Sequence, residues 1–201
     1  QEPDPLTGAV VPPIYQTSTY VQRGPGQAQG FEYSRTNNPS RSALETCLAS
    51  LEHGEHALAF ASGMAACDAV MRLLRPGDHV IICNDVYGGT YRLFERVGAP
   101  FGLQMSYADA TQASAEPGPV ERLITPATRM IWIETPTNPL LRLVDIESIC
   151  VLAHAHNILV VVDNTFATPY GQQPLRWGAD IVIHSTTKYL GGHSDVVGGA
   201  V

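Results

Sequence analysis

A lysine follows a run of hydroxyl residues in the stretch Ser185-Thr186-Thr187-Lys188, directly after a short apolar run over residues 179–183. The apolar run is typical of a buried strand, and the carboxyl ends of strands in an open α/β sheet are where ligands bind. There the hydroxyl groups of Ser185 and Thr187 can hold an anion, and Lys188 can act as a nucleophile or a base. A lysine just past a strand end is more commonly a solvated surface charge, so the other strand ends must decide between the two interpretations.

Three further strand ends carry groups that fit one ligand. The turn Ser62-Gly63-Met64 joins a predicted strand to a helix start, where first-turn amides and the helix dipole bind anions. Asp163 ends an apolar strand, where a carboxylate is costly to ionise without a cationic partner, although a turn aspartate fits the position equally well. Tyr87, in the loop over residues 85–89, can stack on a planar ligand or pack on the core. With Lys188, these groups describe a phosphate, a flat ring with a basic nitrogen and an aldehyde for an amine, which is pyridoxal 5'-phosphate.

Strands and helices are predicted to alternate along the chain. The predicted strands cover residues 56–61, 79–83, 101–107, 130–134, 158–162, 179–183 and 196–201. The first predicted helix begins at Asn38-Pro39 and ends before Gly54. Further helices are predicted over residues 63–74, 90–97, 120–124 and 145–156. Most strands are continuous apolar runs, which is typical of a mainly parallel sheet covered by helices on both faces, an α/β fold.

Composition and charge exclude several classes of function. The chain has 201 residues, of which 12 are basic and 19 acidic, with a formal net charge of −7 and no lysine or arginine cluster. We therefore expect no binding to nucleic acid or to membranes. The longest apolar run, residues 158–162, is too short to span a bilayer and no secretory signal is present, so a cytoplasmic location is expected. Four cysteines without a C-x-x-C pair predict small buried thiols, and seven histidines without ligand spacing predict no metal site.

Residues 1–40 are rich in Pro, Gly, Gln, Ser and Thr and have no sustained hydrophobic periodicity. Such a segment cannot form a core of its own. It nevertheless carries large apolar and aromatic side chains that a free tail would rarely need, namely Ile14, Tyr15, Tyr20, Phe31 and Tyr33. We interpret residues 1–40 as an arm that packs on a neighbouring subunit, and residues 41–201 as a large cofactor-binding domain that is incomplete at its C-terminal end.

Six motifs in order over nearly the whole chain resemble the Cys/Met-metabolism family of pyridoxal-phosphate enzymes. They are Tyr33-Ser34-Arg35-Thr36-Asn37-Asn38-Pro39, Ala61-Ser62-Gly63-Met64-Ala65-Ala66, Asp85-Val86-Tyr87-Gly88-Gly89-Thr90, Glu134-Thr135-Pro136-Thr137-Asn138-Pro139, Val162-Asp163-Asn164-Thr165 and His184-Ser185-Thr186-Thr187-Lys188-Tyr189. The resemblance implies fold type I, the aspartate-aminotransferase-like architecture, with a small C-terminal domain that this chain does not contain.

The resemblance also implies a role for individual residues at the cofactor ring. Lys188 would bond to the cofactor aldehyde and, once freed by the substrate, act as a general base that burial keeps partly neutral. Asp163 would pair with the protonated ring nitrogen, and Thr165 would belong to the same site. Tyr87 would stack on the ring and protonate a leaving group, and Asn138 would contact the 3-oxygen.

The phosphate would be held from two subunits. The residues implied within this subunit are Ser62, Gly63, Met64, Ser185 and Thr187. In this family Tyr33 and Arg35 reach the phosphate of a neighbouring subunit's cofactor, which agrees with the arm interpretation. The implied assembly is a homotetramer built from dimers that share active sites.

The implied activity is that of a cystathionine γ-lyase, which converts L-cystathionine to cysteine, 2-oxobutanoate and ammonia. Glu32 is similar to an acidic residue that these lyases use near the distal ammonium group of cystathionine. Cystathionine γ-synthase, which joins cysteine to an O-acyl-homoserine, fits as an alternative. Methionine γ-lyase fits less well, because its cysteine two residues after the tyrosine is replaced by Gly89.

Two alternatives come from other functional classes. Family chains are about twice this length, so the chain could be a non-catalytic fragment that lacks the arginine for the substrate carboxylate. A nicotinamide-binding module is disfavoured, because no G-x-G-x-x-G follows the first predicted strand.

Overall fold

The computed structural model describes residues 3–112 and 118–201. The chain divides into two compact units, residues 1–59 and residues 60–201. The first unit holds the N-terminal segment and one helix, and the second holds the central sheet. Short strand β1 (Ala59–Phe60) lies at the junction of the two units. The division into an arm before residue 41 and a cofactor domain after it stays a prediction.

Helix α1 (Pro39–Glu52) belongs to the first unit and begins as its sequence predicts. The side chain of Asn38 caps it, accepting hydrogen bonds from two first-turn backbone amides at 2.9 and 3.3 Å. Proline occupies the first helical position, where its missing N–H group would have no partner in the helix. The helix ends at His53, which takes a left-handed backbone conformation with φ of 58°. The residue before the expected glycine therefore ends the helix.

Residues 3–38 contain no helix in the described part of the chain and are linked by local hydrogen bonds. Thr19 pairs with Tyr33 in an isolated antiparallel bridge, and the guanidinium of Arg41 donates to three backbone carbonyl groups of the segment. Five apolar side chains here are 76–90% exposed: Leu6, Val10, Val11, Ile14 and Val21. Exposed apolar groups in such number fit a segment that packs on another surface.

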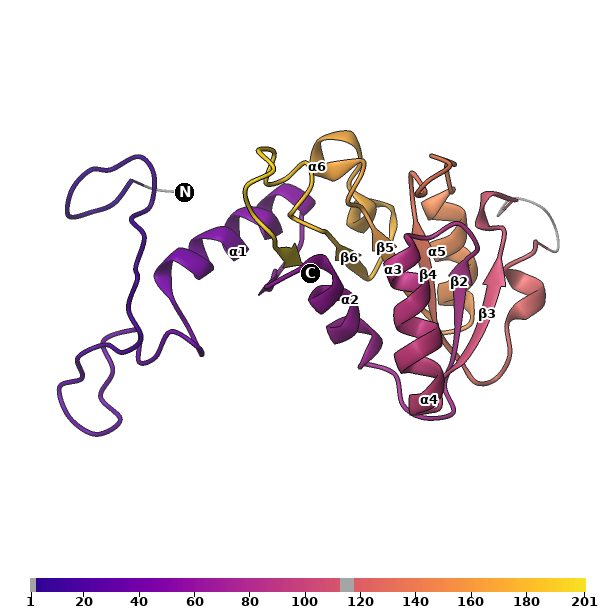
Figure 1. Ribbon diagram of the computed structural model, residues 1–201, viewed down its shortest axis with the longest axis horizontal. Helices are drawn as coiled ribbons and strands as arrows, with labels where there is room; N and C mark the ends of the chain where they lie inside the picture. The colour runs from indigo at the N-terminus through magenta and orange to yellow at the C-terminus, as the bar shows by residue number, and fades with distance from the viewer. Residues whose placement is uncertain (1–2, 113–117) are drawn as a thin grey trace. The chain divides into compact units, whose positions relative to one another are not determined.

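A five-stranded sheet forms the centre of the second unit (Figure 1). In spatial order its strands are β3 (Gln104–Ala108), β2 (His79–Cys83), β4 (Thr128–Glu134), β5 (Leu159–Asp163) and β6 (Ile181–Ile183). Every neighbouring pair runs parallel, which confirms the predicted sheet. In the register of β4 and β5, Glu134 stands opposite Asp163. The polar residues that end these strands therefore lie at one edge of the sheet.

Helices and tight turns connect the strands. The α-helices are α2 (Gly63–Met71), α3 (Gly88–Leu93), α4 (Ala99–Phe101), α5 (Ile146–Ala155) and α6 (Thr168–Gly171). A π-helical segment, Phe94–Gly98, joins α3 to α4, and 3₁₀ turns cover Ala110–Gln112, Glu121–Leu123 and Pro174–Trp177. Helix α6 and the turn after it were not expected from the sequence. Each is shorter than the span over which a helical hydrophobic period can be read.

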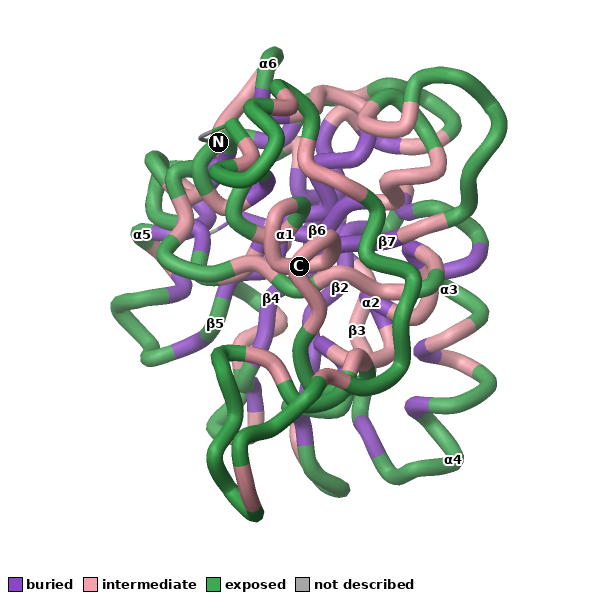
Figure 2. The backbone as a smooth tube through the Cα atoms, turned by 90° about the vertical axis from the view of Figure 1, so that its left-hand side faces the viewer, coloured by how far each residue is buried: buried purple, intermediate pink, exposed green. Residues whose placement is uncertain are grey.

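The core of the second unit lies on both faces of the sheet. Val160, Val161 and Val162 are all fully buried, and successive strand residues point to opposite faces, so both faces are covered. On one side the ring of Phe94 meets the edge of Trp132 with centroids 5.2 Å apart. Figure 2 shows the buried residues concentrated along the strands. Among the described residues, none of the helices combines the length and the apolar composition that a membrane span requires.

Two predicted strands are much shorter in the structure than expected. The stretch predicted over residues 56–61 forms only β1, since Leu58 is 57% exposed and residues 56–58 join no ladder. The stretch predicted over residues 196–201 forms only β7 (Gly199–Ala200), because adjacent glycines weaken a strand. Ala200 exchanges two backbone hydrogen bonds with His184, both 2.9 Å. The cysteines also depart in part from expectation: three are buried, but Cys47 on α1 is exposed.

Candidate active site

The carboxyl ends of β4, β5 and β6 open onto a cavity of about 960 Å³. The last residue of each strand lines it: Glu134, Asp163 and Ile183. The site residues predicted for the second unit line it as well: Ser62, Gly63, Met64, Tyr87, Asn138, Asp163, Thr165, Ser185, Thr187 and Lys188. The structure therefore brings these residues, distant in sequence, to one cavity. Their individual roles stay a prediction.

The turn Ser62-Gly63-Met64 at the start of helix α2, which we call the Gly63 cradle, lines this cavity. Ser62 caps the helix, and its hydroxyl oxygen accepts from the backbone N–H of Ala65 at 3.1 Å. That bond leaves the backbone amides of Gly63 and Met64, which have no carbonyl partner within the helix, as the groups available to an anion. A Cβ at Gly63 would lie only 2.7 Å from the Cβ of Ser185, so no other residue fits this close approach.

The turn after β6 faces the same cavity. Ser185 is fixed through its backbone, which donates to the Thr165 hydroxyl at 2.9 Å, so its own hydroxyl is not used by that bond. The Thr187 hydroxyl is engaged with the backbone of Gly198, donating at 3.2 Å and accepting at 3.1 Å. A phosphate would have to compete with Gly198 for the Thr187 proton. The Lys188 side chain is exposed, whereas the sequence argument expected it to be buried.

Asp163 is held in place by Thr165. It is only 8% exposed, and its Oδ1 accepts from the backbone N–H of Thr165 at 3.0 Å and from the Thr165 hydroxyl. Burial raises the pKa of Asp163 above the usual range of a carboxyl group, while the Thr165 hydrogen bonds and the charge of His184 lower it. A cationic ring nitrogen in the cavity would favour the ionised form further.

Glu134 is a cavity residue that the sequence argument did not single out. It is 5% exposed, and its Oε2 accepts from the backbone N–H of Tyr87 at 2.6 Å. Burial, and then the charge of Asp163, raise the pKa of Glu134 to about 8. A signal was present in the sequence, because Glu134 ends a buried apolar strand in the same manner as Asp163. The thiol of Cys67 also lines the cavity, and burial raises its pKa.

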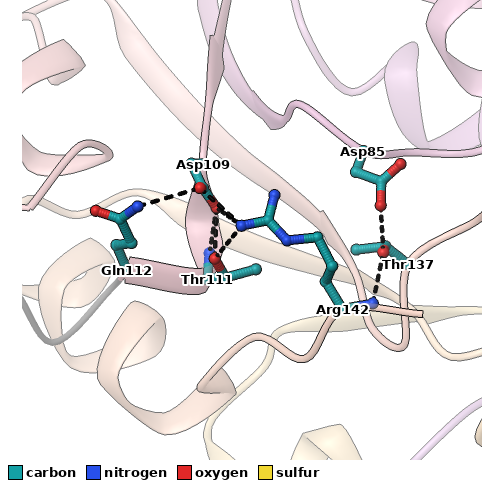
Figure 3. A network of polar contacts seen from close by, with 6 residues as sticks. All are labelled: Asp85, Asp109, Thr111, Gln112, Thr137 and Arg142. Carbon is teal, nitrogen blue, oxygen red and sulfur yellow. Dashed lines mark hydrogen bonds and ion pairs between the residues drawn. The ribbon is translucent and has the colours of Figure 1, made fainter. Parts of the chain in front are cut away.

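The loops that carry Tyr87 and Asn138 are tied together. The hydroxyl of Thr137, next to Asn138, donates to the carboxylate of Asp85 in the Tyr87 loop, as Figure 3 shows. The Tyr87 ring packs over Gly89 so closely that a Cβ added there would collide with it. The position of the Tyr87 ring in this structure therefore requires glycine at position 89.

The remaining predicted site residues lie in the first unit. Tyr33 and Arg35 contact each other, with the guanidinium carbon 5.0 Å from the centroid of the Tyr33 ring. Glu32 accepts through its backbone carbonyl from the N–H of Tyr20 at 3.1 Å, and all three predicted residues are exposed. Their part in a cofactor or substrate site stays a prediction.

The donor set of the cavity fits pyridoxal phosphate. Backbone amides and hydroxyl groups gather where a phosphate would bind, at the Gly63 cradle. A buried carboxylate, Asp163, could stabilise a ring cation, and an amine, Lys188, lines the same cavity. Among the 201 residues Lys188 is the single lysine, so it is the one ε-amine this stretch can offer to an aldehyde.

Comparisons with known proteins point the same way. A family model described as Cys/Met metabolism PLP-dependent enzyme matches residues 1–201. The probable cystathionine gamma-synthase of Herpetosiphon aurantiacus is 59% identical over 201 residues, which are 100% of this chain and 62% of that protein. The cystathionine beta-lyase of Coxiella burnetii is 54% identical over 200 residues, which are 99% of this chain and 51% of that protein.

A solved structure is similar over the entire chain. It is that of cystathionine gamma-lyase from Lactobacillus plantarum complexed with L-serine, with a TM-score of 0.94 and 52% identity. The match covers 100% of this chain and 51% of that one. The chain thus spans 51–62% of the length of these relatives. Their three different names at similar identity leave the specific reaction to be argued from the site.

Proposed function

Because the chain belongs to the family of Cys/Met metabolism PLP-dependent enzymes, we propose that the whole protein cleaves the bond between sulfur and the γ-carbon of L-cystathionine. The products of this α,γ-elimination are cysteine, 2-oxobutanoate and ammonia. Pyridoxal 5'-phosphate is the cofactor of the family. The fold type I architecture expected from the sequence is confirmed by the match to the solved lyase structure.

One observation carries the proposal: Lys188, Asp163 and the Gly63 cradle line a single cavity at the carboxyl edge of a parallel sheet. When bound, pyridoxal phosphate supplies an aldehyde for an amine and a ring that accepts electrons from the substrate. Asp163 holds a proton on the ring nitrogen, and the two bonds from Thr165 orient its carboxylate and favour the ionised form against the effect of burial.

Lys188 acts on the substrate as the general base. Its Nζ removes the proton from Cα and then moves a proton at Cβ, which allows the group on Cγ to leave. The backbone amides of Gly63 and Met64, with the hydroxyl of Ser185, bind the phosphate and so fix the distance between ring and lysine. Thr187 joins them by exchanging its bond to Gly198 for one to the phosphate.

Tyr87 closes the cavity over the ring and protonates the leaving sulfur. Its backbone is bonded to Glu134 and its ring packs over Gly89, which together support a fixed position for the phenol. Asn138 contacts the ring oxygen from the other tied loop. Methionine γ-lyase chemistry is not favoured, since a side chain at position 89 would displace the Tyr87 ring.

We further propose that the N-terminal segment packs on a second copy of the protein, where Tyr33 and Arg35 reach that copy's phosphate and Glu32 reaches the substrate. The exposed apolar side chains of residues 6–21 support a segment that meets another surface. An assembly of four copies built from two such pairs follows from the family resemblance. A cytoplasmic location stays a prediction.

Cystathionine γ-synthase chemistry is the second candidate. It is favoured by the 59% identity to the probable gamma-synthase of Herpetosiphon aurantiacus, whereas the acidic Glu32 favours the lyase. The two reactions share the Cα deprotonation by Lys188. In the synthase reaction the thiol of cysteine replaces the acyl-oxygen leaving group at Cγ, whereas in the lyase reaction the sulfur leaves Cγ and no group replaces it.

Two assays on the whole protein separate the candidates. The first supplies L-cystathionine and measures 2-oxobutanoate; the second supplies O-succinyl- or O-acetylhomoserine with cysteine and measures cystathionine. A lyase gives the larger specific activity in the first assay. A larger activity in the second assigns the synthase, and no activity in either contradicts both candidates.

The cofactor site is tested by chemistry specific to the lysine. Borohydride reduction of the loaded protein should fix pyridoxal phosphate to one peptide of this stretch, the one containing Lys188. In Lys188→Ala that adduct and the visible absorbance of the bound cofactor should both disappear. Retention of the absorbance in Lys188→Ala would contradict the assignment.

A further inference from the structure

Glu134 and Asp163 form a pair of buried carboxyl groups on neighbouring strands. They stand opposite each other in the register of β4 and β5, and they are 5% and 8% exposed. Within the described part of the chain, neither forms an ion pair with a lysine or an arginine. Two adjacent buried charges of the same sign are costly, so one of the two carboxyl groups is expected to keep its proton.

The hydrogen bonds decide which group keeps the proton. Burial raises the pKa of Asp163, but the two hydrogen bonds from Thr165 and the nearby His184 oppose this effect and favour the ionised form. Glu134 accepts one, from the backbone N–H of Tyr87. The proton is therefore expected on Glu134.

The other titratable groups around Glu134 do not reverse this assignment. Asp85, in the loop after β2, adds a further negative charge that raises the pKa of Glu134. The thiols of Cys67 on α2 and Cys83 on β2 stay neutral, since burial raises the pKa of each. The backbone N–H of Glu134 itself lies 3.3 Å from the Cys83 sulfur, which holds the end of β4 in place.

We propose that Glu134 is a positioning residue that holds one proton at neutral pH, anchors the Tyr87 backbone and leaves Asp163 as the single buried charge beneath the cofactor ring. The proposal rests on the proposed function, in which Asp163 faces the ring nitrogen and Tyr87 covers the ring. It assigns a task to a residue that touches neither lysine nor phosphate. Its effect on the reaction passes through Tyr87 and Asp163.

The protonation state can be read without cofactor or activity. In the cofactor-free whole protein at pH 7, infrared spectra should contain the carbonyl stretch of a neutral carboxylic acid. That band should vanish in Glu134→Gln and persist in Glu95→Gln. Glu95 is a matched control, because its carboxylate accepts from the Tyr107 hydroxyl and does not line the cavity. A band that is unchanged in Glu134→Gln would overturn the proposal.

The sharing of the proton is tested by removing the neighbour. In Asp163→Asn the buried charge opposite Glu134 is gone, so the pH midpoint at which the Glu134 band disappears should shift downward. An unchanged midpoint would show that the two carboxyl groups do not share a proton and would overturn the proposal.

The anchoring of Tyr87 is tested in the loaded enzyme with two variants. Glu134→Gln keeps an oxygen that can accept from the Tyr87 N–H, whereas Glu134→Ala leaves that donor unbonded. We expect kcat of Glu134→Ala to be about tenfold below that of Glu134→Gln. Equal rates of the two variants would contradict the anchoring. If Glu134→Ala does not fold, the circular dichroism of the bound cofactor in Glu134→Gln is compared with that of native protein. This signal reports the environment of the cofactor ring. A strongly altered signal contradicts the anchoring of Tyr87 by an uncharged acceptor.

Failure of this inference is distinguishable from failure of the proposed function. If the protein binds no pyridoxal phosphate but the infrared band behaves as expected, the shared proton stands and the function falls. If the cofactor binds through Lys188 and the band is unaffected by Glu134→Gln, the function stands and the role of Glu134 falls.

Discussion

Arg142 binds Asp109 over the end of the strand that separates their loops, with Nη2 at 2.8 Å from Oδ2 and 3.0 Å from Oδ1. Arg142 lies in the loop after β4 and Asp109 directly follows β3, while β2 lies between these strands. The backbone N–H of Arg142 donates to the Thr137 hydroxyl at 2.9 Å, which in turn donates to Asp85 after β2 (Figure 3). The loops after three adjacent strands therefore form one bonded unit, which also carries Asn138.

Removal of the Arg142 side chain should loosen this unit. We expect Arg142→Ala to lower the free energy of unfolding by about 1–2 kcal/mol, because the Asp109 carboxylate loses a charge-assisted partner. The affinity for pyridoxal phosphate should fall as well, since Asn138 is carried by the same loop. Chemical denaturation and cofactor titration of the whole protein measure the two effects.

The control for that variant is Arg72→Ala. Arg72 forms an i,i+4 pair with Asp68 at 2.7 Å, but its side chain is 61% exposed, so solvent screens the pair and the change in unfolding free energy should be much smaller than in Arg142→Ala. Equal losses in the two variants would mean that the Arg142 bond contributes no more than a surface pair.

Gly63 is predicted to be irreplaceable for steric reasons. In Gly63→Ala the new Cβ would lie 2.7 Å from the Ser185 Cβ, so the cradle must open and the phosphate contacts must separate. We expect a loss of about 1–3 kcal/mol in unfolding free energy and weaker cofactor binding. In the control, Gly171→Ala, the new Cβ meets the nearest atom at an ordinary 3.5 Å, so stability should stay close to native. Equal behaviour of the two variants would contradict the close approach.

The fold and much of the site were predictable from the sequence because both depend on local patterns. Continuous apolar runs identify the buried strands, and polar residues directly after them, such as Asp163 and Ser185, are brought to one edge by parallel pairing. The residue types of a turn such as Ser62-Gly63 are sufficient to predict the start of a helix. These signals need no knowledge of distant contacts.

Glu134 and the exposure of Lys188 were not predictable in the same way. The role of Glu134 depends on its being opposite Asp163 in the register and bonded to Tyr87, which are contacts between segments 29 to 47 positions apart in the chain. The turn that carries Lys188 is bonded through Thr187 to Gly198, within a stretch where the sequence predicted a strand. Both features depend on contacts between segments that are distant in the sequence, and the pattern of residues within one segment does not predict such contacts.

Asn38 is predicted to have two separable tasks in the first unit. Its oxygen caps α1, while its Nδ2 donates to the Tyr15 carbonyl and the Ser34 hydroxyl, both at 3.0 Å. Asn38→Asp keeps the capping oxygen and loses the donors; Asn38→Ala loses both. We expect Asn38→Ala to cost about 1 kcal/mol in unfolding free energy and Asn38→Asp much less.

Limited proteolysis distinguishes the second task. Cleavage before residue 34 should be faster than native in both Asn38 variants, since the segment loses the two Nδ2 hydrogen bonds in each. Native cleavage rates in Asn38→Asp would show that the Nδ2 bonds do not hold the segment.

His79 should make the stability of the second unit sensitive to acid. The side chain is 4% exposed and bridges two hydroxyl groups, with Nδ1 at 2.8 Å from Thr128 Oγ1 and Nε2 at 2.9 Å from Ser106 Oγ. Burial lowers the pKa of His79 below its usual value. In the unfolded chain the same imidazole takes up a proton near pH 6.5. Between the two pKa values the unfolded state binds more protons, so the free energy of unfolding falls as pH drops below about 6.5, by at most about 1.4 kcal/mol per pH unit.

Denaturation of the whole protein at pH 7.5 and 5.5 tests the role of His79. The loss of unfolding free energy on acidification should be smaller in His79→Gln than in native protein. The control His193→Gln, which alters an exposed histidine, should lose as much as native protein. Parallel losses in native protein and His79→Gln would place the acid sensitivity elsewhere.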